Sequence, residues 1–272
     1  MNWKNDFSKE NRYFETNNGI LYHGDAIKTM NVFPNNIFDL VLTDPPYGTT
    51  ACKWDSVIPF DEMWEILKKI RKNTTAILLF GSEPFSSLLR ISNLKEFKYD
   101  WIWHKNSGGG FATAKKRPMT RHEIISVFYK KSPIYNPIFQ PYRESVKKRF
   151  KDGEMVNRKK EVINPTNQIH GGLSFEGKTK IDFKRGKYPE TVQYFKSVPN
   201  CNGIRKHPTQ KPLALIEYLI KTYTNERDLV LDFTCGSGTT LVACEKLNRR
   251  WVGIEIDEKY CEITKQRIKE GK

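Results

Sequence analysis

The sequence predicts an α/β fold in which helices cover both faces of a mainly parallel, doubly wound sheet. Short apolar runs that end at turn residues alternate with segments whose apolar residues recur at helical spacing. Seven runs are predicted as strands: 20–23, 38–43, 76–80, 99–104, 124–129, 229–233 and 251–256. This alternation is typical of doubly wound sheets, and no internal repeat points to another architecture.

Four segments are predicted as helices with one apolar face. In the segment 61–70, the residues on one side are Met63, Trp64, Ile66, Leu67 and Ile70. The segments 213–223, 239–247 and 258–268 show similar spacing. Each of these faces can pack on the predicted sheet.

The length fits one large domain with an insertion, or one domain with a small second one, and the composition indicates a polyanionic partner. The chain has 272 residues, enough for a sizeable core, and its formal net charge is +15 with an isoelectric point near 9.5. Nucleic acid is the simplest partner for such an excess of Lys and Arg, although a ribosome or a membrane surface attracts the same charge.

The cysteines and the polar start of the chain predict a protein of the reducing cytoplasm. The cysteines are widely spaced and form no CxxC pair: Cys52, Cys201, Cys235, Cys244 and Cys261. Neither a disulfide framework nor a metal site is indicated. No run approaches the length of a membrane span, so we expect neither export nor membrane insertion.

The region 141–206 carries most of the net positive charge. It contains 16 Lys or Arg against 7 Asp or Glu, with aromatic residues between them. Cations neutralise phosphates and aromatic groups can contact bases, so we predict a nucleic-acid-binding region, with a solvated face as the alternative for any single cluster. The residues predicted to bind nucleic acid are Lys147, Lys148, Arg149, Arg158, Lys159, Lys160, Lys184 and Arg185.

The stretch LTDPPYGTT, residues 42–50, places Asp44 at the carboxyl end of the predicted strand 38–43. In an open α/β sheet, ligands bind in the crevice outside the carboxyl ends of the strands. Asp44 is therefore a candidate functional residue, with an ordinary tight loop as the alternative. The two prolines that follow lack an N–H and fix the backbone beside it.

The stretch VLDFTCGSGTT, residues 230–240, joins a strand ending in Asp232 to a small-residue turn and a helix that begins near Thr239. Gly236 and Gly238 let the backbone approach a ligand, and the free N–H groups at the helix start favour an anionic group. Glu255 ends the next strand and is placed to accept hydrogen bonds from ribose hydroxyls. The Walker spacing GxxxxGK[ST] is absent, so a nucleoside without a polyphosphate is the favoured ligand.

TDPPY followed much later by FTCGSGTT resembles the two hallmark motifs of amino-methylating DNA methyltransferases, which modify adenine N6 or cytosine N4. The motif order is similar to that of the beta group, in which the catalytic motif comes first. The resemblance covers nearly the whole chain, through LYHGDAI, RHEIISVFYKK, HPTQKPLALIEYLI and VGIEIDEKYCEITKQRI. It implies a Rossmann-like methyltransferase fold with a seven-stranded sheet, S-adenosylmethionine as cofactor and double-stranded DNA as partner.

The same resemblance implies a domain organisation and further partners. Residues 1–140 would form the catalytic half of the methyltransferase domain, 141–206 an inserted target-recognition region, and 207–272 the cofactor-binding half. A homodimer and a cognate restriction endonuclease are also compatible with this family.

The resemblance assigns catalysis to Asp44, Pro45, Pro46 and Tyr47. The Asp44 carboxylate and the Pro45 carbonyl would accept the two hydrogens of the target amine, so that its lone pair turns toward the methyl sulfonium. Tyr47 would stack on a base flipped out of the duplex. The residues implied to bind the cofactor are Asp25, Ala26, Lys211, Asp232, Phe233, Cys235, Gly236, Ser237, Gly238, Thr239 and Glu255.

Other interpretations of these residues stay open. Asp25 and Glu255 could cap the helices that follow them, and His207 could belong to an ordinary turn. Trp54 either packs on the core or closes over the bound base. The glycines 108–110 are predicted to form a mobile loop that meets DNA phosphates.

The resemblance favours adenine N6 as the methylated atom. An initial Asp is typical of the adenine members of the family, whereas Ser is typical of the cytosine members. A glutamine methyltransferase is disfavoured because its cofactor motif comes first. The alternative from another class is a DNA-binding module that has lost catalysis.

Overall fold

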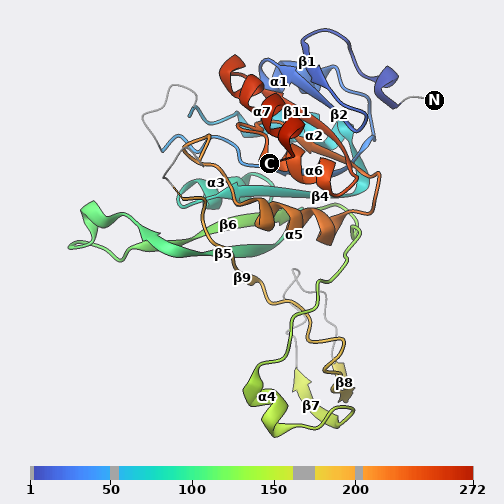
Figure 1. Cartoon of the computed structure of the whole chain (residues 1–272), viewed down its shortest axis with the longest axis vertical. Coiled ribbons are helices and arrows are strands. Elements are labelled where there is room, and N and C mark those ends of the chain that lie inside the picture. Colours follow the sequence, from blue (N-terminus) through green and yellow to red (C-terminus); the bar gives the residue numbers. More distant parts are fainter. Residues whose placement is uncertain (1–2, 50–54, 162–174, 200–204, 272) are drawn as a thin grey trace. The chain divides into compact units, whose positions relative to one another are not determined.

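The computed structural model describes residues 3–49, 55–161, 175–199 and 205–271, and it divides into two compact units. One unit comprises Met1–Asn136 and Thr191–Lys272, and the other is Pro137–Glu190 (Figure 1). The side chains of 157–161 and 175–179 are outside the description. Cys52, Trp54 and Cys201 also lie outside the described residues, so the predictions for them stay predictions.

The larger unit contains the predicted α/β sheet. Among the described residues this sheet has nine strands, in the order β1-β2-β11-β10-β3-β4-β6-β5-β9. The five strands from β2 to β4 in this order are parallel, and β6 is antiparallel to β4 and β5. Their bounds are β1 Arg12–Glu15, β2 Gly19–His23, β3 Phe38–Thr43, β4 Arg71–Gly81, β5 Phe97–Gly109, β6 Thr120–Phe128, β9 Val192–Tyr194, β10 Leu229–Asp232 and β11 Arg250–Glu255.

The structure confirms the fold class and corrects the number of strands from seven to nine. All seven predicted strands are present, and the two additional strands are β1 and β9, at the two edges of the sheet. Both are short, and neither consists of fully buried residues. Edge strands of this kind have no continuous apolar run, which is the feature from which the other strands were predicted.

Helices cover both faces of the sheet, as the sequence predicts (Figure 1). Side chains of α1 Ala26–Asn31, α2 Phe60–Ile70 and α3 Phe85–Ser92 pack in the core on one face. Side chains of α5 Leu213–Tyr223, α6 Thr239–Lys246 and α7 Glu258–Glu270 pack on the other. Short 3-10 helices occur at η1 Trp3–Asp6 and η2 Phe111–Thr113.

The strands contribute side chains to both cores. In β3, Phe38 and Val41 face the first core, whereas Leu40 and Leu42 face the second. All four side chains are fully buried, and each such burial contributes roughly 1.5–3 kcal/mol. The apolar run of β3 therefore fixes the position at which Asp44 leaves the sheet.

The antiparallel strands β5 and β6 continue beyond the sheet as a hairpin, which projects from it in Figure 1. Gly108 and Gly109 belong to β5, and Gly110 has a left-handed backbone with φ of 88° at the tip. The exposed tip carries Phe111 and a basic segment. The glycines predicted to form a loop therefore lie in a strand and the turn that ends it.

The smaller unit, Pro137–Glu190, has little regular structure. It contains α4 Glu144–Arg149 and the antiparallel pair β7 Met155–Glu161 and β8 Phe175–Lys180. Two aromatic pairs hold its ends together, Phe139 with Tyr188 at 5.0 Å and Tyr142 with Phe183 at 5.4 Å between ring centroids. Residues 192–194 pair with β5 as β9, so they belong to the larger unit.

Candidate active site

The two sequence motifs meet because β3 and β10 are adjacent parallel strands. Asp44 follows β3 and Asp232 ends β10, so both lie at the same edge of the sheet. Thr43 Oγ1 donates a hydrogen bond to Asp232 Oδ1 at 2.6 Å, and Thr234 Oγ1 donates to the Asp44 main-chain oxygen at 3.1 Å. These two bonds join the motif segments directly.

A cavity of about 360 Å³ opens at this edge of the sheet, which is the size of a small-molecule site. The predicted site residues that line it are Asp25, Ala26, Asp44, Pro45, Pro46, Tyr47, Lys211, Asp232, Phe233, Cys235, Gly236, Ser237, Thr239 and Glu255. Gly238 is outside this lining and precedes α6 with φ of 75°. A Cβ at Gly238 would lie 2.4 Å from Thr264 Cγ2, so this glycine permits the turn to pack against α7.

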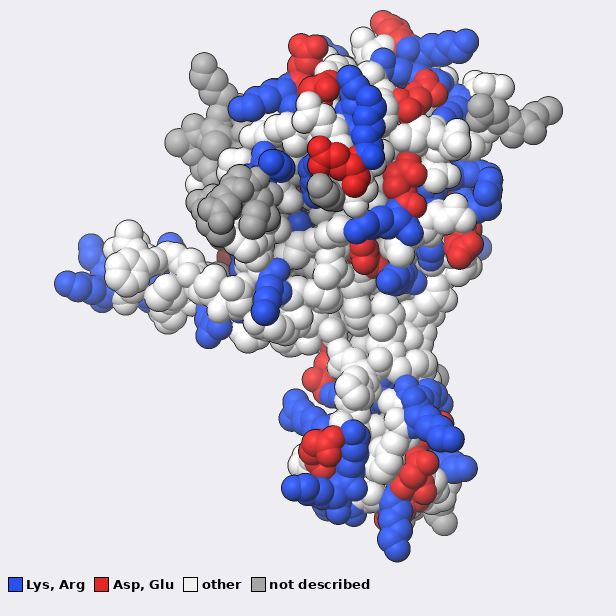
Figure 2. Space-filling model, in the orientation of Figure 1, with Lys and Arg blue, Asp and Glu red and all other residues white. Residues whose placement is uncertain are grey.

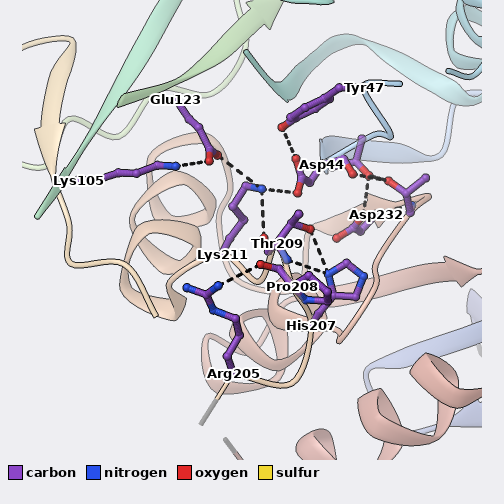
Figure 3. Close-up of polar contacts among 12 residues, drawn as sticks. Asp44, Tyr47, Lys105, Glu123, Arg205, His207, Pro208, Thr209, Lys211 and Asp232 are labelled. Atoms are coloured by element: carbon purple, nitrogen blue, oxygen red, sulfur yellow. Dashed lines mark hydrogen bonds and ion pairs between the residues drawn. The ribbon is translucent and has the colours of Figure 1, made fainter. Parts of the chain in front are cut away.

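Asp44 is held by two donors, one from its own loop and one from a distant segment (Figure 3). The Tyr47 hydroxyl donates to Asp44 Oδ1, and Lys211 Nζ donates to Oδ2. Lys211 Nζ also lies 3.5 Å from Glu123 Oε2, and Lys105 Nζ donates to Glu123 Oε1. The result is a chain of alternating charges from Lys105 through Glu123 and Lys211 to Asp44.

Burial and charge act in opposite directions within this chain. Burial raises the pKa of Asp44, although the Lys211 ammonium opposes the shift. Burial also disfavours the charged form of Glu123, but Lys211 and Lys105 outweigh it and lower the Glu123 pKa. For Lys211, the two carboxylates outweigh burial and raise its pKa. Lys211 is therefore cationic and Glu123 anionic at neutral pH.

The Tyr47 ring packs on Phe85, with ring centroids 4.9 Å apart and planes inclined by 32°. Burial, with the nearby Asp44, raises the pKa of Tyr47, so its hydroxyl stays protonated and donates to Asp44. Gly48 and Thr49 follow in the same loop, and their N–H groups both donate to the Asp55 carboxylate at 2.9 Å. Asp55 therefore fixes the backbone after the motif.

The glycine turn is attached to β11 through Glu255. The Gly236 N–H donates to Glu255 Oε2 at 2.7 Å, and the Asp257 N–H donates to Oε1 at 2.9 Å. The N-cap of α7 is Asp257, whose side chain accepts from the Lys259 N–H. Capping of that helix by Glu255 itself, the alternative interpretation from the sequence, is therefore wrong.

Asp25 both caps a helix and lines the cavity. Its Oδ1 accepts a hydrogen bond from the Lys28 N–H at 2.9 Å, which makes it the N-cap of α1. The capping interpretation is confirmed, and Asp25 remains exposed at the cavity wall.

His207 also lines the cavity, and its ring packs against the Tyr260 ring with the two ring centroids 4.3 Å apart. Burial and the nearby Lys211 lower the pKa of His207 to about 4, so its ring is neutral at pH 7. The turn that contains His207 leads through Thr209, whose carbonyl accepts from Lys211 Nζ at 3.3 Å. This turn therefore places Lys211 beside Asp44 (Figure 3).

Sequence reasoning missed Asp55, Glu123 and Lys105 as site residues. Glu123 and Lys105 come together because β5 and β6 pair with Trp103 opposite Glu123. The sequence shows only that Lys105 and Glu123 each stand at the end of an apolar run. Charged residues are common at strand ends, so this position alone does not indicate a site residue.

The predicted DNA-binding residues lie in the smaller unit. Lys147 pairs with Glu144 at 2.7 Å, and the Arg149 and Arg185 guanidinium groups lie over aromatic rings. Lys148 and Lys184 are exposed. Arg158, Lys159 and Lys160 lie in β7, but their side chains are outside the description.

Comparison with known proteins identifies the family. A family model for DNA methylases, N6_N4_Mtase, matches residues 38–266. The chain belongs to the N6/N4 DNA methylase family. The match includes both motifs and the whole region between them.

Individual relatives agree with this family. The Type II methyltransferase M.HpaI of Haemophilus parainfluenzae is 30% identical over 258 residues, covering 90% of this chain and 72% of that protein. The DNA adenine methyltransferase YhdJ of Escherichia coli is 25% identical, covering 91% of this chain and 82% of that protein.

Solved structures share the fold. The structure of the M1.HpyAVI complex with SAM has a TM-score of 0.57 and 24% identity, covering 91% of this chain and 98% of that chain. The cytosine-N4-specific PvuII DNA methyltransferase has a TM-score of 0.61 and 18% identity, covering 97% of each chain.

None of the helices in the described part of the chain has the length and apolar character of a membrane span.

Proposed function

We propose that this DNA methylase transfers a methyl group from S-adenosylmethionine to the exocyclic N6 amine of adenine, after the base leaves the duplex. The observation that carries the proposal is the single cavity in which the Asp44 loop and the Asp232 glycine turn meet. An acceptor for an amine hydrogen and a glycine turn for a nucleoside are thereby brought within one site.

The residues of the cavity fit S-adenosylmethionine. Glu255 ends β11 with its carboxylate at the cavity wall, where it can accept from ribose hydroxyls. Gly236 and Ser237 form a turn without bulky side chains, and Asp232 and Cys235 line the same wall. When bound there, S-adenosylmethionine supplies an electrophilic methyl group on a sulfonium.

The Asp44 loop supplies the chemistry on the base. The exocyclic amine is a weak nucleophile because its lone pair is delocalised into the ring. Asp44 and the Pro45 carbonyl accept the amine hydrogens, which turns the lone pair out of the ring plane. Tyr47 offers a ring for the flipped base, which has lost its stacking in the duplex. No covalent bond between enzyme and base is required.

Adenine is favoured over cytosine by the Asp at the first position of the motif. YhdJ, whose name specifies adenine, supports this choice among the relatives. Cytosine N4 is the second candidate, because the solved structure of the cytosine-N4-specific PvuII enzyme has a similar fold over nearly the whole chain.

Two surfaces are proposed to hold the DNA. The smaller unit carries many Lys and Arg side chains, which Figure 2 shows on the face in view. The tip of the β5–β6 hairpin adds the exposed residues Lys115, Lys116 and Arg117. The cations of both surfaces would neutralise DNA phosphates. We assign target recognition to the inserted region 141–206.

Further partners follow from the same proposal. Several relatives are named Type II methyltransferases, which supports a cognate restriction endonuclease. A homodimer and a cytoplasmic location are also proposed. Sedimentation of the protein with and without DNA would measure its oligomeric state.

Transfer of labelled methyl groups from S-adenosylmethionine to unmethylated DNA tests the proposal. We expect label in DNA with the wild-type protein and a loss of most of it in Asp44→Ala. DNA binding without transfer at any salt concentration would instead identify a binding module that has lost catalysis.

A further inference from the structure

The proposed catalytic carboxylate already accepts a hydrogen bond on each of its two oxygens in the structure. Asp44 Oδ1 accepts from the Tyr47 hydroxyl, and Oδ2 accepts from Lys211 Nζ. In the proposed function, an oxygen of the same carboxylate must accept a hydrogen from the target amine. A carboxylate that is paired with a buried ammonium is a weaker hydrogen-bond acceptor, because the cation already offsets part of its negative charge.

A second carboxylate lies ready for the same ammonium. Glu123 Oε2 is buried and lies 3.5 Å from Lys211 Nζ, beyond the distance of a good hydrogen bond. The other oxygen, Oε1, accepts from Lys105 Nζ, which also lies 4.7 Å from the Trp103 ring centroid. Burying a carboxylate is costly unless it is paired, and at 3.5 Å the Lys211 ammonium pairs with Oε2 by charge without a close hydrogen bond.

We propose that Lys211 exchanges between two carboxylates, resting on Asp44 in the free enzyme and moving to Glu123 when the target amine binds Asp44. The inference deepens the proposed function and rests on it. Glu123 is a positioning residue, because it acts on the reaction through Lys211 and does not touch the base.

The geometry places both carboxylates within reach of Lys211. Lys211 Nζ lies between them, and a shift of less than 1 Å brings Glu123 Oε2 to roughly 2.8 Å. Release of Asp44 Oδ2 then takes a further rotation of the flexible lysine side chain. The Thr209 carbonyl, 3.3 Å from Nζ, gives a third acceptor beside both positions. The lysine stem passes over Phe80, with Nζ 5.1 Å from the ring centroid, so the ammonium remains confined to this region.

The exchange also keeps the charge of the buried group balanced. Lys105 and Lys211 are the cations, and Asp44 and Glu123 are the anions. Lys211 therefore stays paired with one carboxylate or the other while Asp44 is free to bind the amine. Without Glu123, the ammonium would have no anionic partner to move to.

Two variants with opposite expected effects test the exchange. Glu123→Gln keeps the shape of the side chain but removes its charge, so Lys211 stays on Asp44. We expect kcat at saturating S-adenosylmethionine and DNA to fall at least 10-fold, with KM for both changed less than threefold. Lys105→Gln leaves Glu123 dependent on Lys211, which favours the position of the ammonium on Glu123, so kcat should rise at least twofold.

A conservative variant separates exchange from simple loss of structure. Glu123→Asp keeps a carboxylate on β6 for the ammonium, so its kcat should lie at least threefold above that of Glu123→Gln. Equal kcat in these two variants would overturn the exchange. Unchanged kcat in folded Glu123→Gln, or an unchanged or lower kcat in Lys105→Gln, would also overturn it, and the second result decides the matter if Glu123→Gln does not fold.

An equilibrium measurement provides a readout without turnover. Duplexes that carry either adenine or purine, which lacks the amine, at the methylated position are compared for binding in the absence of S-adenosylmethionine. We expect the wild type to prefer adenine several-fold and Glu123→Gln to lose that preference; an equal preference in both proteins would contradict the exchange. If the wild type transfers no methyl group to DNA, the proposed function has failed, whereas an active wild type with an unaffected Glu123→Gln variant rejects the exchange alone.

Discussion

Asp44 occupies a position that both motifs determine. Its main-chain oxygen accepts from Thr234, which belongs to the glycine motif, and its carboxylate is oriented by Tyr47 and Lys211. The carboxylate is thereby fixed before a base arrives. Preorganised acceptors of this kind are worth more than flexible ones, because the carboxylate itself does not have to turn when the base arrives, even though Lys211 moves aside.

Replacing Asp44 by Asn tests its role with little change in shape. The amide still accepts one hydrogen bond, but it lacks the negative charge that polarises the target amine. We expect kcat to fall roughly 100-fold or more, by analogy with the loss of one preorganised electrostatic group. Dissociation constants for S-adenosylmethionine and DNA, measured by titration, should change less than threefold, and near-normal turnover would refute the assigned role.

Asp232 makes the stability of the protein depend on pH. Burial raises the pKa of Asp232 from 3.8 to about 6, so the folded protein binds this proton more tightly than the unfolded chain. The free energy of unfolding should therefore fall as pH rises from about 4 to about 6. Asp232→Asn cannot titrate, so its stability relative to wild type should increase by about 2 kcal/mol between pH 4 and pH 7.

Urea unfolding at several pH values measures this effect. Subtracting the two proteins at each pH removes contributions from other groups, while the lost hydrogen bonds of Asp232 give a constant offset. A stability difference that does not vary with pH would show that Asp232 titrates at its ordinary pKa.

At the scale of elements, the β5–β6 hairpin is predicted to contact DNA phosphates. Changing Lys115, Lys116 and Arg117 to Gln removes three exposed cations from its tip. Each lost phosphate contact should flatten the dependence of log K on log salt by about 0.9, so the slope should decrease by roughly 1–3.

The control variant removes the same charge elsewhere. The control residues are exposed on α1, α2 and α6 and are far in the sequence from the hairpin tip: Lys28, Lys68 and Lys246. Their change to Gln should alter the slope by less than one unit. Equal slopes for the two triple variants would show that the hairpin tip is a solvated surface that does not contact DNA phosphates.

The sequence was informative wherever one element carries its own signal. Strands such as β3 and β10 are continuous apolar runs, and Asp44 and Asp232 could be placed from the turns that follow them. Glu123 and Lys105 could not be found in this way, because their contact depends on the register of β5 against β6. The position of Lys211 between Asp44 and Glu123 depends on a third segment, the turn before α5.

At the scale of the whole molecule, charge is distributed unevenly along the chain. The region 141–206 contributes a surplus of nine positive charges, from 16 Lys or Arg and 7 Asp or Glu, to a net charge of +15. The proposed catalytic residues lie in the larger unit, whereas most of the predicted phosphate contacts lie in the smaller one. Binding and catalysis should therefore respond to different substitutions.

The identity of the methylated nucleoside tests the central claim most directly. The protein is incubated with S-adenosylmethionine and unmethylated DNA, the DNA is digested to nucleosides, and the products are separated and weighed by mass spectrometry. We predict N6-methyldeoxyadenosine, absent from the Asp44→Ala reaction. N4-methyldeoxycytidine as the sole product, or no methylated nucleoside at all, would contradict the account.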